Sequence, residues 1–153
     1  MLYAFGTIRI LIENPITNLK KARELLISGD YTCAVCCGSI TYTTHERGVK
    51  PLLNWLDAGA DLKAASAADR VVGRGAAFLY CLLSVKEVHA RVMSRPAAEV
   101  LEAHGIAALA DTFVDGIINR RGTGPCPFED AVMEITDPRE ALAAIRQKMT
   151  QMK

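Results

Sequence analysis

The chain has 153 residues, of which 50% are hydrophobic and 23% are charged. That length accommodates one domain with a substantial core, and two full domains would fit only tightly. The net charge of +1 predicts no nucleic-acid partner, because no overall basic excess is available to neutralise phosphates. No apolar run approaches the roughly 20 residues of a membrane-crossing helix, so no membrane partner is expected either.

The cysteines and the N-terminal residues favour a cytoplasmic protein. Five cysteines, an odd number in a core-forming chain, fit a reducing compartment better than a disulfide framework. The N-terminal run MLYAFGTIRILIENP is apolar, but Arg9 and Glu13 interrupt it, so it does not resemble a secretory signal. We interpret residues 1–16 as an extension, either an edge strand through IRILIE or a disordered terminus, and residues 17–153 as one domain.

Helix and strand patterns alternate from the start of that domain. The segment TNLKKARELLISGD predicts a helix, because its apolar residues share one face and Gly29 ends it. The segments YTCAVCC and ITYTT, separated by Gly38-Ser39, predict a β-hairpin. Pro51 begins a short helix that continues through Leu56 and closes at Gly59.

The second half continues this alternation. A long helix is predicted over residues 66–83, followed by a strand over KEVHARVM and a helix over PAAEVLEAHG. Residues 106–118 give a weaker pattern, with a short strand predicted over residues 113–118. Two final helices begin at Pro125 and Pro138. The alternation favours an α/β fold, a three-layer α/β/α sandwich with crossover connections.

Three cysteines, Cys33, Cys36 and Cys37, lie within the first predicted strand. Residues 33 and 36 of a strand point to opposite faces, and residues 33 and 37 lie about 13 Å apart on one face at ~3.3 Å per residue. Neither pair chelates one ion without a sharp turn, and the scattered histidines do not supply a second ligand pair. We therefore expect no metal site and no cofactor here, and we interpret these cysteines as small core hydrophobes.

The segment GTGPCPFEDAV places Cys126 between two prolines at a predicted helix start. Pro125 and Pro127 suit a chain entering its first helical turn. A cysteine there lies at the positive end of the helix dipole, which favours thiolate over thiol. Cys126 is therefore a candidate catalytic residue, with a simple helix cap as the alternative.

A second candidate site lies in SAADRVVGRGAAF. Ser66 and Asp69 match a capping box with Asp in place of Glu, whereas the functional interpretation places the Asp69 carboxylate in a cleft, where it exchanges protons. Arg74 either faces solvent or contacts an anion. Gly73 and Gly75 cost roughly 1 kcal/mol each inside a helix, which indicates close packing against a helix, a partner subunit or a ligand.

Two loops contain candidate anion-binding residues. The segment INRRGTGPC places two arginines and a GTG turn before a predicted helix start, where free N–H groups and the dipole attract anions. Thr123 is alternatively only a cap for that helix. The segment THERGVKP is a polar loop after a strand, and it either lines a site or is merely solvated. The candidate ligand-binding residues are Arg47, Lys50, Arg74, Arg120, Arg121, Thr123 and Gly124.

Nearly the whole chain from about Leu19 resembles an uncharacterised prokaryotic family, the domain of unknown function DUF1893. The matching segments, in order, are YTCAV, ERGVKPLLNWL, AADRVVGRGAAFLY, INRRGTGPCPFEDAV and DPREALAAI. That family is placed in the cytidine-deaminase-like superfamily, which implies a central mixed sheet flanked by helices. In active members, a helix bearing [His/Cys]-x-Glu and a helix bearing Pro-Cys-x-x-Cys meet at zinc.

The resemblance places Ala67-Ala68-Asp69 at the first of these elements and Pro125 to Glu129 at the second. Ala67 cannot bind zinc, Glu129 replaces the second cysteine, and Asp69 is one methylene shorter than glutamate. Ordinary zinc-dependent deamination is therefore not expected. The resemblance implies a remaining cleft with Asp69, Cys126 and Glu129 as the catalytic candidates.

Three functions remain open. We favour a deaminase-like domain without the zinc ligands that binds a nucleotide-like or other small anionic ligand in the remaining cleft. The first alternative is a thiol-dependent enzyme or redox protein that uses Cys126. The second alternative is a homo-oligomerising or regulatory module without catalysis, whose glycine-rich helix forms the interface.

Overall fold

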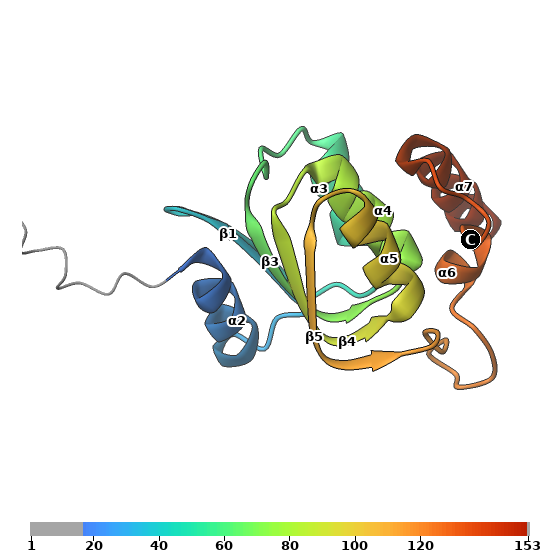
Figure 1. Cartoon of the computed structure of the whole chain (residues 1–153), viewed down its shortest axis with the longest axis horizontal. Helices are drawn as coiled ribbons and strands as arrows, with labels where there is room; N and C mark the ends of the chain where they lie inside the picture. The colour runs from blue at the N-terminus through green and yellow to red at the C-terminus, as the bar shows by residue number, and fades with distance from the viewer. Residues whose placement is uncertain (1–16, 153) are drawn as a thin grey trace, which may run out of the picture.

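The computed structural model describes residues 17–152, which are built around a mixed five-stranded sheet (Figure 1). The strands are β1 (Cys33–Cys37), β2 (Ile40–Thr44), β3 (Ser66–Val72), β4 (Glu87–Ser94) and β5 (Ala107–Val114). Their order across the sheet is β2-β1-β3-β4-β5. β3, β4 and β5 are parallel, and β1 is antiparallel to both of its neighbours. The expected α/β fold is confirmed, while the predicted extension, residues 1–16, lies outside the described residues.

Helices cover both faces of the sheet (Figure 1). The helices of the described residues are α2 (Asn18–Ser28), α3 (Lys50–Asp57), α4 (Arg74–Leu83), α5 (Arg95–Ala103), α6 (Pro127–Ala131) and α7 (Pro138–Gln151). Among residues 17–152, α2 is the helix that packs on one face, against β1 and β3, and α3, α4 and α5 pack on the other. α6 and α7 lie outside α4. None of the helices in this part of the chain combines the length and hydrophobicity that a membrane crossing requires.

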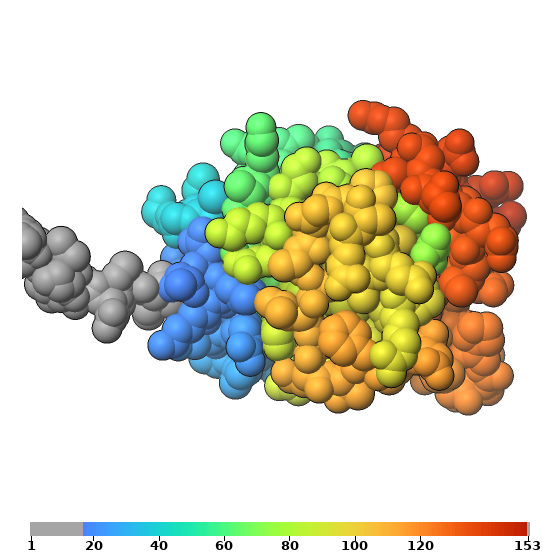
Figure 2. Space-filling model, viewed as in Figure 1, coloured from blue at the N-terminus to red at the C-terminus, as the bar shows by residue number. Residues whose placement is uncertain are grey.

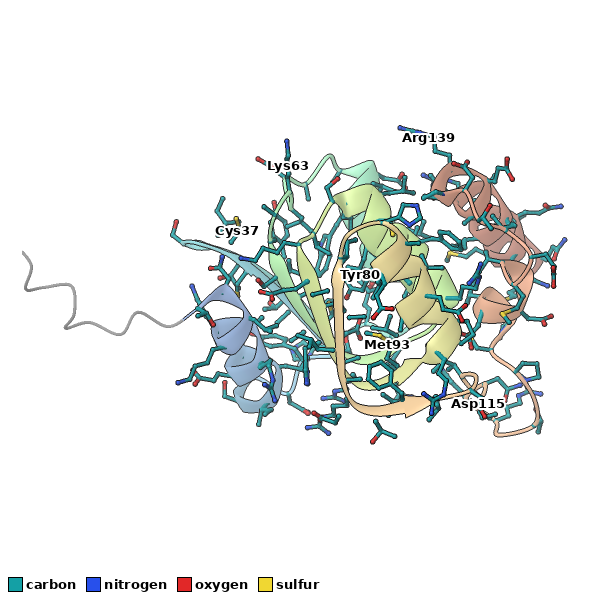
Figure 3. All side chains as sticks on the ribbon, viewed as in Figure 1. Cys37, Lys63, Tyr80, Met93, Asp115 and Arg139 are labelled. Carbon is teal, nitrogen blue, oxygen red and sulfur yellow. The ribbon has the colours of Figure 1, made fainter. Side chains whose placement is uncertain are left out.

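Two hydrophobic cores lie on opposite faces of the sheet. Alternate residues of β1 divide between them, with Cys33 facing the larger core beneath α4 and Cys36 facing the smaller core beneath α2. Both are buried free thiols, which confirms their prediction as small core residues on opposite strand faces. Tyr80 and Met93, labelled in Figure 3, are fully buried in the larger core.

Several predicted elements are confirmed because their local signals agree with the packing. The hairpin of β1 and β2 turns through Gly38, whose φ of 61° is readily adopted only by glycine. α2 begins after Thr17, whose hydroxyl accepts the N–H of Lys20. α3 has a proline in its first turn and is followed by Gly59 with φ of 70°.

The predicted long helix over residues 66–83 is wrong, because its first part is the central strand β3 and only its second part is a helix. Gly73 separates the two in an extended conformation. β3 is covered by helices on both faces, so its apolar residues form a near-continuous run rather than an alternating pattern. The capping box is therefore absent, and the Ser66 hydroxyl donates instead to the Glu87 carboxylate at 2.6 Å.

The strand predicted over residues 113–118 is only partly correct, because β5 spans Ala107–Val114. β5 is an edge strand of the described sheet and most of its residues are at least partly exposed. Asp111 and Thr112 therefore interrupt the apolar pattern without interrupting the strand. α6, predicted to begin at Pro125, begins at Pro127 and is five residues long.

Figure 2 shows one face of the folded chain, with α2 and α7 at opposite ends. Most residues of α4 are buried. Residues Arg74 to Tyr80 are all buried against the sheet and the neighbouring helices. The chain itself therefore covers the glycine-rich start of α4.

Candidate functional site

Four chain connections meet at one edge of the sheet. β3, β4 and β5 are parallel, so their carboxyl ends share this edge, where Gly73 precedes α4 and Ser94 caps α5. β2 also ends there, because Thr44 is paired with Cys33 at the start of antiparallel β1. Ligands of open α/β sheets bind outside the carboxyl ends of strands. This edge is therefore the place to examine the predicted residues.

Glu129 lies at the centre of this edge and is only 5% exposed. Its Oε2 atom accepts the backbone N–H of Arg74, the first residue of α4, at 2.8 Å. The Ser94 hydroxyl donates to the same oxygen. The Oε1 atom accepts the N–H of Ile117 at 2.6 Å. One carboxylate thus joins the starts of α4 and α5 to the loop that follows β5.

Arg74 is 9% exposed, and its side chain does not reach solvent as a ligand-binding arginine would. Its guanidinium donates to the carbonyl oxygens of Val132 at 3.0 Å, Ile135 at 2.7 Å and Pro96 at 3.3 Å. It also lies 5.3 Å from the centre of the Phe78 ring. Arg74 therefore fixes the segment between α6 and α7 on α4, which replaces its predicted role as an anion contact.

The two glycines near the start of α4 allow α6 and the preceding loop to approach closely. A Cβ atom on Gly75 would lie 3.1 Å from the carbonyl oxygen of Phe128. A Cβ atom on Gly73 would lie 3.2 Å from Ile117 and 3.4 Å from Glu129 Oε2. The predicted close packing is confirmed, and the packing partner belongs to the same chain.

The residues at the meeting point of α4 and α6 do not fit zinc. The start of α4 offers Gly73, Arg74 and Gly75, which include no zinc ligand. Cys126 is a single thiol, and hydrogen bonds from three donors occupy the Glu129 oxygens. No cluster of three or more His, Cys, Asp or Glu side chains suited to a metal occurs within residues 17–152.

Cys126 is the N-cap of α6, and its side chain makes no capping hydrogen bond. Its thiol is half-buried, and its backbone N–H donates to the Ile117 carbonyl at 2.8 Å. The prediction of a cysteine at a helix start is confirmed. The hollow beside it, described below, is lined by Pro125 and Glu129 but not by Cys126.

Asp69 belongs to a different group of side chains. It lies in β3, and its Oδ2 atom accepts the Tyr80 hydroxyl at 2.6 Å. Cys33 Sγ lies 3.2 Å from the same hydroxyl oxygen. Among residues 17–152, no hydrogen bond or ion pair joins Asp69 to Cys126 or Glu129. The predicted position of Asp69 at a helix start is therefore wrong, because the strand continues past it.

Burial controls the ionisation of this second group. It raises the pKa of Asp69 to about 6, an effect that the Tyr80 hydrogen bond partly opposes. Burial and the neighbouring Asp69 charge raise the pKa values of Cys33 and Tyr80 well above their usual ranges. Cys33 and Tyr80 are thus protonated at neutral pH, and Asp69 is the group that titrates near it.

The tip of the loop before α6, residues 119–124, is closed by its own hydrogen bonds. Thr123 donates its N–H to the Asn119 side-chain oxygen at 3.0 Å, and its hydroxyl accepts from the Asn119 amide at 3.1 Å. The Asn119 N–H donates to the Gly124 carbonyl at 2.8 Å, and the Gly122 N–H donates to the Asn119 carbonyl at 3.0 Å. Thr123 thus stabilises the loop rather than capping α6, and the N–H groups of residues 122 and 123 are already used.

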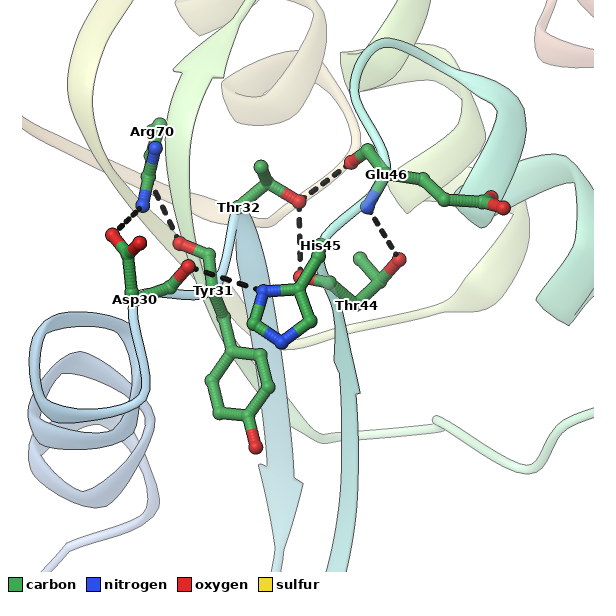
Figure 4. A network of polar contacts seen from close by, with 7 residues as sticks. All are labelled: Asp30, Tyr31, Thr32, Thr44, His45, Glu46 and Arg70. Atoms are coloured by element: carbon green, nitrogen blue, oxygen red, sulfur yellow. Dashed lines mark hydrogen bonds and ion pairs between the residues drawn. The ribbon is translucent and has the colours of Figure 1, made fainter.

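The loop between β2 and α3 is fixed by the polar network of Figure 4. The Thr32 hydroxyl donates to the carbonyl oxygens of Thr44 and Glu46. The Glu46 N–H donates to the Thr44 hydroxyl at 3.1 Å, and His45 Nδ1 lies 3.2 Å from the Asp30 carbonyl oxygen. These contacts hold residues 44–46, which directly precede Arg47.

The structure brings the two predicted basic segments together. A Cβ atom placed on Gly48 would lie 3.9 Å from the Nη2 atom of Arg120. The basic side chains of the two segments are all exposed, and none takes part in an ion pair among the described residues. We call this group the basic rim, and it consists of Arg47, Lys50, Arg120 and Arg121.

A hollow of about 450 Å³ lies between α6 and the loop that joins β5 to α6. Its lining residues are Asp115, Gly116, Ile117, Ile118, Gly124, Pro125, Glu129, Asp130 and Met133. Ile118 and Met133 are among the exposed large hydrophobic residues of the chain. The hollow therefore combines an apolar surface with carboxylates, and Gly124 is the predicted ligand-binding residue that lines it.

Sequence reasoning missed Tyr80, Ser94 and Ile117. Ser94 was detectable, because Ser-Arg-Pro followed by alanines is a typical helix start, and its hydroxyl accepts the Ala97 N–H. The sequence pattern places Tyr80 in a helix but gives no indication that its hydroxyl contacts Asp69. Ile117 contributes through its backbone, which leaves no signal in the residue type.

Comparisons with known proteins agree with this fold. The model of the TM1506 family, domain of unknown function DUF1893, matches residues 21–149. A solved structure of a DUF1893 family protein (TM1506) from Thermotoga maritima is similar, with a TM-score of 0.77, 24% identity and coverage of 92% of each chain. No curated protein matches the chain. At that identity the likeness to the solved structure concerns the fold alone.

Proposed function

The chain belongs to the DUF1893 family, and on that premise we propose that it is a deaminase-like domain without a zinc site that binds a small anionic, nucleotide-like ligand at the carboxyl edge of its sheet. The basic rim contacts the anionic group. The observation that carries the proposal is the approach of the β2–α3 loop to Arg120.

The arrangement of α4 and α6 supports the deaminase-like part of the proposal. The starts of both helices meet at the carboxyl edge of a mixed sheet, where Glu129 accepts the Arg74 N–H. The resemblance implies that two helix starts meet in this way, although residues 67–69, which it assigns to the first helix, lie on β3. The contact between the helices is kept here through hydrogen bonds, so the ligand site does not require the metal.

The basic rim supports an anionic ligand. Its four cations come from two segments far apart in the sequence, the β2–α3 loop with the first residue of α3 and the loop before α6. The two segments adjoin at Gly48 and Arg120. Like charges repel one another, so an anion bound between them relieves that repulsion as well as attracting each cation. The neighbouring hollow offers apolar surface for the uncharged part of a nucleotide-like ligand.

The experiment is an NMR titration with inorganic pyrophosphate and, separately, with AMP. We expect amide shifts in residues 46–50 and 119–124 with both probes, and additional shifts around Ile118 and Met133 with AMP. The variant R120A/R121A should bind pyrophosphate about tenfold more weakly, since exposed ionic contacts contribute roughly 0.2–1 kcal/mol each. Arg139→Ala, an exposed cation on α7, is the matched control. Absence of shifts at millimolar probe would overturn the proposal.

A further inference from the structure

Three hydrogen-bond donors from different parts of the chain converge on one buried carboxylate. They are the N–H of Arg74 at the start of α4, the N–H of Ile117 in the loop after β5, and the hydroxyl of Ser94. Ser94 is fully buried, and Glu129 is nearly so. Charge-assisted hydrogen bonds in a dry environment are among the strongest in proteins.

We propose that these three donors form an anion cradle whose resident ligand is the chain's own Glu129, and that this internal contact positions the loop bearing Arg120 and Arg121. The consequence for ligand binding rests on the proposed function. The contact between the three donors and Glu129 does not depend on the proposed function.

The geometry of α4 favours a negative charge at this point. α4 has ten residues, and its first N–H group points at Glu129 Oε2. Gly73 leaves the room that the carboxylate uses, since a Cβ there would lie 3.4 Å from Oε2. Ser94 contributes twice, because its oxygen accepts the Ala97 N–H while its hydrogen is donated to Glu129.

The same contact anchors the base of the loop. Ile117 donates its N–H to Glu129, and its carbonyl accepts the N–H of Cys126. An isolated bridge between Ile118 and Pro125 continues this pairing one residue further. Both ends of the loop are thereby tied to Glu129, and loss of the carboxylate is expected to loosen the segment that contains the two arginines.

The test is limited trypsin cleavage of Glu129→Ala with and without formate. Cleavage after Arg120 and Arg121 is compared with cleavage after Lys63, an exposed residue in a separate loop. We expect the variant to be cut severalfold faster than wild type in the Arg120–Arg121 segment relative to Lys63. Formate should reverse the increase by refilling the cradle, whereas neutral formamide of similar size should not. Glu134→Ala, an exposed glutamate beyond α6, is the matched control and should resemble wild type.

A purely structural role for Glu129 would accelerate cleavage throughout the chain and would not respond to formate. That result, or unchanged relative cleavage in Glu129→Ala, would overturn the proposal. If Glu129→Ala does not fold, Glu129→Gln keeps the volume and removes the charge, and the amide resonance of Ile117 should move upfield as its hydrogen bond weakens. An unchanged Ile117 resonance would overturn the proposal equally.

These outcomes are separable from the proposed function. Wild-type protein that binds no pyrophosphate contradicts the proposed function and leaves the cleavage test of the cradle intact. Wild-type binding that persists at full strength in Glu129→Gln contradicts the positioning of the basic loop by Glu129.

Discussion

Tyr80 donates its hydroxyl hydrogen to the Asp69 carboxylate across 2.6 Å, which joins the middle of α4 to the central strand β3. Cys33 on β1 contacts the same hydroxyl. The group lies within the fold rather than at the loops of the proposed ligand site, so its protonation is expected to affect stability.

The first prediction concerns the pH dependence of folding. Burial raises the pKa of Asp69 from 3.8 to about 6 in the folded state. The folded state therefore holds this proton more tightly than the unfolded state, and its stability falls as the pH rises from about 4 to about 6. The loss is at most about 3 kcal/mol, from 1.36 kcal/mol per pKa unit.

Asp69→Asn removes the titration and keeps an oxygen for Tyr80. We expect the free energy of unfolding of this variant, relative to wild type, to increase with pH over that interval and to level off above it. Urea unfolding at a series of pH values measures the difference, and other titrating groups cancel in the comparison. A difference that does not change with pH contradicts the account of Asp69.

The second prediction concerns the close approach of α4 and α6. Gly75→Ala would gain up to about 1 kcal/mol in helix propensity but would press a Cβ against the Phe128 carbonyl at 3.1 Å. Overpacking against backbone costs about 1–3 kcal/mol, so we expect a net destabilisation of about 0–2 kcal/mol once the propensity gain is subtracted. Gly116→Ala is the control, because its nearest neighbour is Glu129 Oε1 at an ordinary 3.7 Å. Stabilisation of Gly75→Ala by the full propensity gain of about 1 kcal/mol would show that α6 does not press on α4.

The third prediction concerns Cys126. The residue occupies the N-cap of α6 in an extended conformation without a side-chain capping bond. Serine at this position accepts a backbone N–H of the first turn, so Cys126→Ser should stabilise the protein by about 0.5–1 kcal/mol. Thermal unfolding measures this gain, and pyrophosphate binding should be unchanged. A loss of binding in Cys126→Ser would instead place the thiol in contact with the ligand.

The sequence predicts this fold well where local and tertiary signals coincide. A cap, a turn glycine or a clear spacing of apolar residues marks each of the elements predicted correctly, which are the β1–β2 hairpin, α2, α3 and α5. β3 was predicted as a helix because a strand covered on both faces loses its alternation. Gly73, the residue that separates the strand from the helix, was interpreted as an interior glycine.

The candidate site is also predictable from the sequence only in part. The basic residues lie in loops or, for Lys50, at the start of α3, and the polar composition of these segments indicates loops. The proximity of Gly48 to Arg120 depends on how distant segments pack, so no local pattern indicates it. The error over residues 66–83 placed Asp69 in the site, although Asp69 lies on β3. It also gave Arg74 an exposed role, although its guanidinium donates to backbone carbonyls of the same chain.

The fourth prediction concerns the basic rim, and its measurement is the most direct test of the account. Pyrophosphate affinity is measured by calorimetry for wild type, Arg47→Ala, Arg120→Ala and the control Arg139→Ala. Because the β2–α3 loop and the loop before α6 adjoin, both Arg47→Ala and Arg120→Ala should weaken binding severalfold, and Arg139→Ala should not. Wild-type affinity in both single variants, or no binding by wild type, would contradict a single anion site formed by the two loops.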